Sequence, residues 1–301
     1  MTFEQLAIFV AVAEREHLTR AAEVLNLTPS AVSSALRALE SYYGVALFDR
    51  VGRGIVLNEN GRMFLGEAKS VLARAEEARH VLGEIGGLRR GRLAIAASQT
   101  IACYWLPAPM VRFHERFPGI ELELSIGNTA TVAEAVAAGD ADIGFVEGVV
   151  DVPALQLRKI TEDALIVVVG ADHPWTDGRA LEAEDMVEGS RWILRERGSG
   201  TRSAFEVDLR ARGVDPARLD VSLEFPSNEA VLSAVRAGGF ATVVSASVAE
   251  PFLGRGDLVA VHYELPTRAY SLLHHRERRL SRSAMELVDL LRGAGSADGA
   301  Q

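Results

Sequence analysis

One stretch of the chain combines small hydroxyl residues with a single arginine at helical spacing. Residues 29–43 follow Thr28, a common type of helix N-cap, and begin with a proline, which is favoured in a first turn. Val32, Leu36 and Leu39 form an apolar stripe on that helix. The opposite face carries Ser30, Ser33, Ser34, Arg37 and Ser41. Small hydroxyl groups let a helix approach base edges and phosphates in a major groove, whereas a solvated helix face, the alternative, more often carries Glu and Lys.

The elements around this helix favour the DNA interpretation. Residues 3–16 have the spacing of an amphipathic helix, and Thr19 is a suitable N-cap for a short helix that ends at Leu25. Gly44 ends the third helix, and a turn at 52–54 joins the two short strands that follow. Arginines on this hairpin would reach flanking phosphates or the minor groove, as a wing does. We therefore predict DNA contacts from Thr28, Pro29, Ser30, Ser33, Ser34, Arg37, Arg50 and Arg53.

Four junctions between a strand and a helix carry hydroxyl, amide or glycine residues. Free N–H groups make a helix N-terminus a site for anions, although a Ser, Thr or Asn there can also simply cap its helix. The segment from Gly198 to Arg202 is the most informative, because glycines allow close approach and Arg202 can bind an oxyanion through two N–H groups. It lacks the lysine of a P-loop, which disfavours nucleotide hydrolysis. The predicted effector-binding residues are Ser98, Gln99, Thr100, Thr129, Glu147, Ser199, Thr201, Arg202, Ser227 and Asn228.

Two further side chains leave alternatives open. Glu147 either lines the ligand site, where it would repel an anion or accept from a ligand hydroxyl or amine, or pairs with a nearby arginine. Cys103 is the only cysteine, which excludes an internal disulfide and a CxxC pair. Its apolar neighbours predict a core residue rather than a thiol sensor. We expect no metal site and no cofactor beyond a small-molecule effector.

The periodicity of the chain predicts an α+β multidomain protein. Apolar residues in 59–88 recur at heptad spacing, which predicts either a helix that pairs with a second copy or one that packs on its own domain. From residue 92 onward, strands alternate with helices in two sets, which predicts two α/β lobes with parallel sheets and a ligand cleft. The predicted divisions are a winged helix-turn-helix at 1–58, a linker helix at 59–91, an effector domain at 92–292 and a disordered tail at 293–301. Lobe I would take about 92–162 and 266–292, and lobe II about 163–265.

Composition and charge fit this division. The 301 residues are 48% hydrophobic and 24% charged, as in globular domains, and no apolar run reaches the ~18 residues of a membrane-spanning helix. The net charge is −9, but residues 1–92 carry 12 basic and 11 acidic side chains against 20 and 30 in the rest. An acidic body on a near-neutral N-terminal part fits a protein that touches DNA only with that part. The N-terminus lacks the basic region of a signal peptide, so we expect a cytoplasmic protein.

The stretch LAIFVAVAEREHLTRAAEVLNLTPSAVSSALRALESYYGVALFDRVGRGIVLNENG carries a long and specific pattern. With it, residues 1–66 resemble the LysR-type transcriptional regulators. The matching residues are Phe9, Ala21, Ala22, Leu25, Val32, Ser33, Leu39, Glu40, Gly44, Leu47, Phe48, Arg50 and Gly61. The departures are His17-Leu18 in place of Ser-Phe, Pro29-Ser30 in place of Gln-Pro, and Ser34 where Arg is frequent. The last departure removes a usual DNA contact.

The resemblance extends over nearly the whole chain. It implies a winged helix-turn-helix, a dimerising linker helix and an effector domain of two α/β lobes like a periplasmic binding protein, often assembled as a tetramer on dyad-symmetric DNA. The segments WILRERGSGTR, ASQTIACYWLP and GFVEG are similar to a branch that contains regulators of sulfur assimilation and carbon fixation. That branch implies an oxyanion or a phosphorylated metabolite as effector.

The expected function is therefore sequence-specific transcription regulation. The expected partners are pseudo-palindromic double-stranded DNA, a small and anionic effector, and further copies of the chain as a homodimer or homotetramer, with no membrane. The alternatives are a cytoplasmic solute-binding protein and an enzyme that uses the cleft. We expect no enzyme, because no Ser-His-Asp set, paired carboxylates or metal cluster stands out in the sequence.

Overall fold

The computed structural model describes residues 1–52, 54–85 and 91–295, and it describes only the backbone at 76, 77, 80–85 and 292–295. Contacts between residues divide the chain into two compact units, of which the first consists mainly of residues 1–85. Among the helices of the described part, none is long and apolar enough to cross a bilayer.

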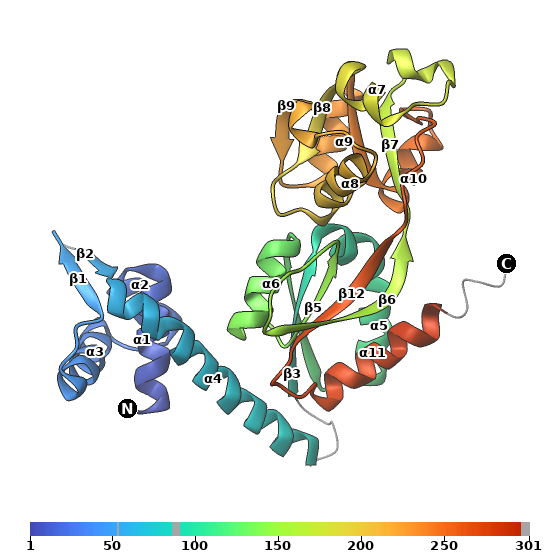
Figure 1. Cartoon of the computed structure of the whole chain (residues 1–301). Coiled ribbons are helices and arrows are strands. Elements are labelled where there is room, and N and C mark those ends of the chain that lie inside the picture. Colours follow the sequence, from blue (N-terminus) through green and yellow to red (C-terminus); the bar gives the residue numbers. More distant parts are fainter. Residues whose placement is uncertain (53, 86–90, 296–301) are drawn as a thin grey trace. The chain divides into compact units, whose positions relative to one another are not determined.

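The first unit combines three short helices, a hairpin and one long helix (Figure 1). Its elements are α1 (Phe3–Arg15), α2 (Leu18–Val24), α3 (Pro29–Tyr43), β1 (Phe48–Val51), β2 (Gly54–Leu57) and α4 (Glu59–Ile85). Local signals fix the ends of α3, as the sequence predicts. The Thr28 hydroxyl accepts from the N–H of Ala31 at 3.2 Å, and Gly44 takes a left-handed φ of +67° after the last turn.

The start of α2 differs from the prediction. The helix begins after His17 rather than at Thr19, because the His17 Nδ1 accepts from the N–H of Arg20 at 3.4 Å and acts as the N-cap. An imidazole nitrogen here fills the place that a hydroxyl oxygen usually takes.

The core of the first unit is built around Phe9, which is fully buried. Its ring lies 5.6 Å from that of Phe48 on the hairpin and 5.0 Å from that of Phe64 on α4. Ala68 of α4 is also fully buried in this core, whereas Val71 is 39% exposed. The predicted heptad seam therefore begins on its own domain, whereas Val71 and Ala78 further along it are exposed.

The predicted seam ends at Leu82 and Ile85. The side chains of Leu82 and Ile85 lie outside the described residues, as do residues 86–90 and the tail at 296–301.

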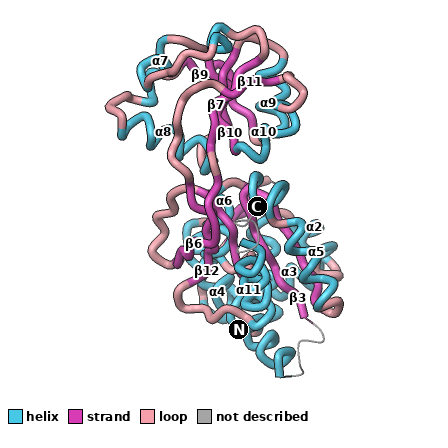
Figure 2. The backbone as a smooth tube through the Cα atoms, turned by 90° about the vertical axis from the view of Figure 1, so that its right-hand side faces the viewer, coloured by secondary structure: helices cyan, strands magenta, loops and turns pink. Residues whose placement is uncertain are grey.

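The second unit contains two five-stranded sheets, each with its own helices (Figures 1 and 2). The first sheet has the strand order β4-β3-β5-β12-β6, and we call it and its helices lobe I. Lobe I consists of β3 (Gly91–Ser98), η1 (Ile101–Trp105), α5 (Pro107–Arg116), β4 (Ile120–Gly127), α6 (Thr129–Ala138), β5 (Ile143–Glu147), β6 (Leu155–Asp163), β12 (Arg268–His275) and α11 (Arg282–Gly295).

The second sheet has the strand order β11-β7-β10-β8-β9, and we call it and its helices lobe II. Lobe II consists of β7 (Leu165–Gly170), η2 (Pro174–Asp177), α7 (Ala183–Glu188), β8 (Arg191–Arg195), α8 (Gly200–Ala211), η3 (Pro216–Arg218), β9 (Asp220–Phe225), α9 (Asn228–Arg236), β10 (Phe240–Ser245), α10 (Ala246–Leu253) and β11 (Leu258–Ala260). The chain enters lobe II from β6 and returns to lobe I at β12 (Figure 1).

Both sheets are mixed, whereas the sequence predicts parallel ones. β3, β4 and β5 pair in parallel, as do β8, β9 and β10. The other strands, β6, β7, β11 and β12, pair antiparallel with their neighbours. These are the strands beside the crossings between lobes, where the chain returns without an intervening crossover helix.

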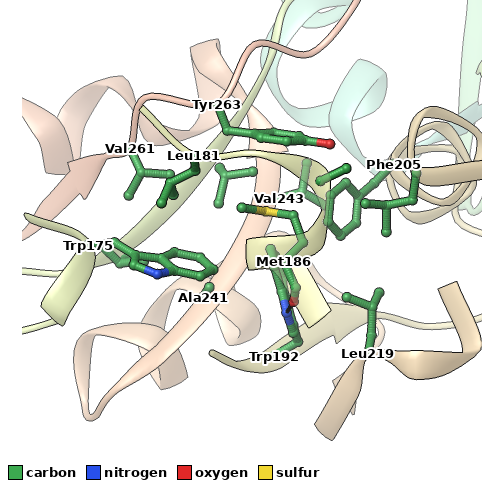
Figure 3. Packing of buried hydrophobic residues seen from close by; sticks show 14 of the residues in the cluster. Trp175, Leu181, Met186, Trp192, Phe205, Leu219, Ala241, Val243, Val261 and Tyr263 are labelled. Carbon is green, nitrogen blue, oxygen red and sulfur yellow. Dashed lines mark hydrogen bonds between the residues drawn. The ribbon is translucent and has the colours of Figure 1, made fainter. Parts of the chain in front are cut away.

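A cluster of aromatic side chains in lobe II fixes the position of α8 (Figure 3). The ring of Trp192 lies 6.1 Å from that of Trp175 and 4.9 Å from that of Phe205 on α8. Figure 3 also shows Tyr263 beside this cluster, and its hydroxyl donates to Asp208 of α8 at 2.7 Å. The rigid packing of this helix matters because its first turn belongs to the candidate site.

Gly61 provides a test of the packing between α4 and the hairpin. An added Cβ there would lie 2.2 Å from the Leu47 carbonyl oxygen, so Gly61→Ala should lower the unfolding free energy of the first unit by about 1–3 kcal/mol. The control is Gly66→Ala in the same helix, where nothing lies within 4 Å. That change should raise stability by about 0.5–1 kcal/mol, since alanine favours a helix interior. Calorimetry of the full chain measures both, and equal transition temperatures would contradict this packing.

Candidate DNA interface and effector site

The face of α3 that is predicted to read DNA lies open to solvent. Ser30, Ser34 and Arg37 are exposed, and Ser33 is half-buried. The Arg37 Nε donates to the Ser33 carbonyl at 3.3 Å, which lays the side chain along the helix. Its terminal amino groups have no partner among the described residues, so they are available to acceptors outside the chain.

The remaining predicted DNA contacts fall into two groups. At the start of α3, the Thr28 Oγ1 caps the helix and lies 3.0 Å from the Ser30 Oγ, and Pro29 is exposed in the first turn. On the hairpin, Arg50 is exposed on β1, whereas Arg53 lies outside the described residues. Thr28 therefore has a structural role in addition to any contact with phosphate.

Gln99, one of the predicted effector residues, joins the two lobes. Its amide oxygen accepts from Arg195 Nη1 at 2.9 Å and from the N–H of Asn228 at 2.8 Å, both in lobe II. Its amide nitrogen donates to Glu229, also in lobe II. The Asn228 side chain accepts from Arg195 Nη1 at 3.0 Å and donates to Thr100 Oγ1 at 3.1 Å. The predicted junction that carries Gln99 and Thr100 thus contacts the one that carries Asn228 directly.

Arg195 is buried, and its side chain donates four hydrogen bonds. Its Nε and Nη2 bind the two oxygens of Glu196 at 2.9 and 3.1 Å. Glu196 also accepts from the Asn128 amide of lobe I at 3.1 Å. Partial burial opposes ionisation of Glu196, but the hydrogen bonds and charge of Arg195, together with Asn128, hold its pKa below the ordinary value.

A second buried arginine, Arg268, lies where the chain returns to lobe I. Its Nη2 is 2.7 Å from Asp163, and its Nη1 is 3.6 Å from Glu147. The same Nη1 donates to the Thr201 hydroxyl of lobe II at 2.9 Å. The Ser98 hydroxyl donates to Glu147 from the end of β3. Glu147 therefore takes the structural alternative and pairs with an arginine.

The lobes also touch through their backbones, at Gly200 in the first turn of α8. A Cβ on Gly200 would lie 2.1 Å from the Glu147 carbonyl oxygen. The Thr129 hydroxyl donates to that same carbonyl at 2.7 Å, and the N–H of Ala130 donates to Gly198 at 3.3 Å. Only glycine fits here without a shift of one lobe against the other.

Ser199 and Ser227 begin helices α8 and α9, but their hydroxyl groups differ in use. Ser227 accepts from the N–H of Ala230 at 3.1 Å and is an ordinary cap. Ser199 is 2% exposed, and its hydroxyl has no hydrogen-bond partner among the described residues. A hydroxyl group without a partner at the N-cap of α8 can donate to a ligand or a water.

Arg202, one of the predicted effector residues, is hydrogen-bonded within lobe II. Its Nε donates to Glu206 at 2.8 Å, and its Nη1 donates to Glu224 at 2.6 Å and to the Arg195 carbonyl at 3.1 Å. With two carboxylates beside it, this guanidinium ties α8 to β8 and β9 within lobe II. Its Nε and Nη1 are therefore engaged within the lobe.

Several residues of this region escape the sequence analysis. Arg195 had a usable signal, because it ends a strand whose other members are almost all apolar. Arg268 and Asp163 are 105 positions apart and meet only through the fold. Tyr104 donates to Glu229 at 2.9 Å, and these two residues are likewise far apart in the sequence, 125 positions from each other.

Cys103 is exposed, which corrects the expectation of a core residue. Ile101 and Ala102 are buried in the core of lobe I, whereas Cys103 and Tyr104, the next two residues of η1, are exposed. Partial burial and the nearby Glu229 raise the pKa of the Cys103 thiol, which disfavours the reactive thiolate. In the described part of the chain, no group of three His, Cys, Asp or Glu side chains could hold a metal ion.

Two protein-family models match the chain. Residues 3–62 match the bacterial regulatory helix-turn-helix protein, lysR family, and residues 86–296 match the LysR substrate binding domain. The chain is 35% identical over 291 residues to the uncharacterized HTH-type transcriptional regulator YeiE of Escherichia coli (strain K12), with 96% of each covered. It is 32% identical to the RuBisCO operon transcriptional regulator of Allochromatium vinosum, with 94% of this chain and 93% of the relative covered.

One solved structure resembles the second unit with a ligand bound. It is the regulatory domain of CcmR from Synechocystis PCC6803 in complex with 2-PG. The TM-score is 0.62 and the identity 26%, over 68% of this chain and 97% of that one.

The pairing of Glu196 with buried Arg195 predicts a pH-dependent stability. Glu196→Gln should lower the unfolding free energy at pH 7 by more than about 1 kcal/mol, because it leaves a buried guanidinium without its charge partner. Since the pKa of Glu196 is lowered in the folded protein, this contribution is fully present above the ordinary value of 4.5. It is lost as the pH falls through the lower folded value. Urea unfolding from pH 7 to pH 3 should show the two proteins converge, with exposed Glu115→Gln as the control. A constant gap would argue against the pair.

Proposed function

The chain belongs to the LysR family of transcriptional regulators, and from that premise we propose which of its residues read DNA and which hold its effector. We assign residues 1–58 to the DNA-binding domain, 59–91 to the linker helix and 92–292 to the effector domain. Ser30, Ser33, Ser34 and Arg37 contact bases, while Arg50, Arg53 and the start of α3 contact phosphates. The open hydroxyl face of α3 is the observation that supports this assignment.

The proposed DNA-binding form is a homodimer. Val71 and Ala78 of the α4 seam are exposed within one copy, and a second α4 would cover them. Two copies of α3 would then reach two half-sites about 34 Å apart on a pseudo-palindromic operator, and two dimers would form the expected tetramer.

We propose that the effector is a small anion bound at the first turn of α8. The observation that carries this is the hydroxyl of Ser199, a residue that is 2% exposed at the N-cap of α8 and whose hydroxyl has no partner among the described residues. The N–H groups of the first turn and the helix dipole favour negative charge at that point. The bound 2-PG named for the CcmR regulatory domain supports an effector of this kind.

The effector regulates by binding one arrangement of the lobes more tightly than another. A ligand shifts such an equilibrium only by its difference in affinity for the two states. The linker helix then carries the change to the DNA-binding domain. On this proposal the protein acts in the cytoplasm, beside the DNA, and the effector domain binds its ligand without converting it.

Replacing Arg37 tests the DNA interface. Arg37→Ala should weaken specific operator binding by about 1–3 kcal/mol, as the loss of a base contact does. Arg112→Ala on exposed α5 removes the same side chain from the effector domain and should leave binding unchanged. Fluorescence anisotropy on an operator and on an unrelated duplex, at fixed salt, separates specific from nonspecific loss. Equal operator affinity of Arg37→Ala and the parent would remove Arg37 from the interface.

Replacing Ser199 tests the effector site. Thermal stabilisation by phosphate, sulfate and 2-PG should identify at least one ligand, since a ligand at about 100 times its Kd adds about 2.7 kcal/mol. Ser199→Ala should weaken that ligand about tenfold through the loss of a hydrogen bond to a charged group, with little change in the unliganded protein. Ser222→Ala on exposed β9 is the matched control. Undiminished stabilisation of Ser199→Ala would move the site away from α8.

A further inference from the structure

The contacts between the lobes differ in their exposure to solvent. Arg268 and Arg195 are 6% and 4% exposed, and the hydrogen bonds between them and the opposite lobe are largely closed to water. The hydrogen bonds from Gln99 Nε2 and Tyr104 Oη to Glu229 are exposed, and Tyr104 itself is 38% exposed. A solute can therefore reach the second set without the lobes first coming apart.

The Glu229 carboxylate is held as a bound carboxylate ligand would be. Gln99 donates to one of its oxygens and Tyr104 donates to the other, at 2.9 Å. Both donors belong to lobe I, whereas Glu229 belongs to the first turn of α9 in lobe II. One amide N–H and one phenol O–H directed at the two oxygens match the acceptor pattern of any carboxylate.

The charge states on both sides fit such a contact. Partial burial opposes ionisation of Glu229, but its own backbone N–H, Tyr104, Gln99 and the nearby Arg195 lower its pKa below the ordinary value. Burial and the hydrogen bond to Glu229 raise the pKa of Tyr104, so the phenol keeps its proton and remains a donor. At neutral pH the contact therefore joins an anion to two neutral donors.

We propose that Gln99 and Tyr104 form a carboxylate subsite that Glu229 fills in the unliganded protein as an internal competitor of the effector. This inference rests on the proposed anionic effector and narrows its class to anions that carry a carboxylate group. The effector carboxylate takes the two donors, and Glu229 is released to solvent. Because donors and competitor belong to different lobes, the exchange removes a contact between the lobes at the moment of binding.

The energetics allow the exchange. Exposed hydrogen bonds contribute little net free energy, because each partner can bind water instead. A competitor tethered within the same chain nevertheless has a high effective concentration, so it weakens the observed affinity for a free carboxylate. Removing Glu229 should therefore strengthen the binding of carboxylates specifically.

The test uses the full chain with malonate and inorganic phosphate as separate probes. A given thermal stabilisation should be reached at a roughly tenfold lower malonate concentration in Glu229→Ala than in the parent, while the phosphate curve stays in place. Glu229→Gln, which keeps the size but not the charge, should show part of the gain. Adding Tyr104→Phe to Glu229→Ala should abolish the gain, because one of the two donors is gone. Glu121→Ala on exposed β4 is the control and should behave as the parent.

A readout without ligand accompanies the titrations. Amide hydrogen exchange at 227–231 should be faster in Glu229→Ala than in the parent, since the N–H of Asn228 also relies on Gln99. Unchanged malonate binding in Glu229→Ala, with phosphate still binding, would overturn the inference and leave the proposed effector site intact. Failure of every anion to stabilise the parent and the variant would overturn the anionic effector, and with it this subsite.

Discussion

A buried guanidinium needs a counter-charge, and the arrangement of the effector domain depends on how Arg268 obtains one. Its side chain is 5% exposed, and leaving such a charge unpaired would cost several kcal/mol. Asp163, at the end of β6, lies 2.7 Å from the Arg268 guanidinium, and Glu147, at the end of β5, lies 3.6 Å from it. The Thr201 hydroxyl adds a partner from α8 in the other lobe. One charge thus draws together both crossings of the chain and the first turn of the helix at which we place the effector.

The second group of contacts between the lobes has a different character. Gln99 and Tyr104 donate to Glu229 at an edge that solvent reaches. Exposed hydrogen bonds of this kind exchange with water or solutes at small cost, whereas the Arg268 cluster does not. The domain therefore combines a permanent ionic contact with an exchangeable one. A ligand that acts on the exchangeable contact can change the relation of the lobes without breaking the buried charges.

The sequence predicts best what local chemistry decides. Thr28 and Gly44 bound α3 because a hydroxyl cap and a left-handed glycine act within four residues. His17 replaced Thr19 as a cap, since a ring nitrogen can do the work of a hydroxyl oxygen. The pairing of Arg202 on α8 with Glu224 on β9 could not be predicted, because the two residues are 22 positions apart and meet through the fold. The antiparallel strands at the crossings and the exposure of Cys103 likewise depend on distant segments.

The family itself was evident, because its motifs are long, and the similarity to a RuBisCO operon regulator agrees with the branch that those motifs indicate.

The ring of Phe64 lies 5.0 Å from that of Phe9, so the base of α4 is part of the core that also holds α3. The base of α4 and the DNA-binding domain should therefore move as one rigid body. With 27 residues at about 1.5 Å each, α4 is a lever about 40 Å long. A displacement of about 7 Å at its far end corresponds to a rotation of about 10° at α3, and 7 Å is about two base-pair steps of DNA. A small rotation of α4 would therefore be enough to change which base pairs α3 contacts on the operator.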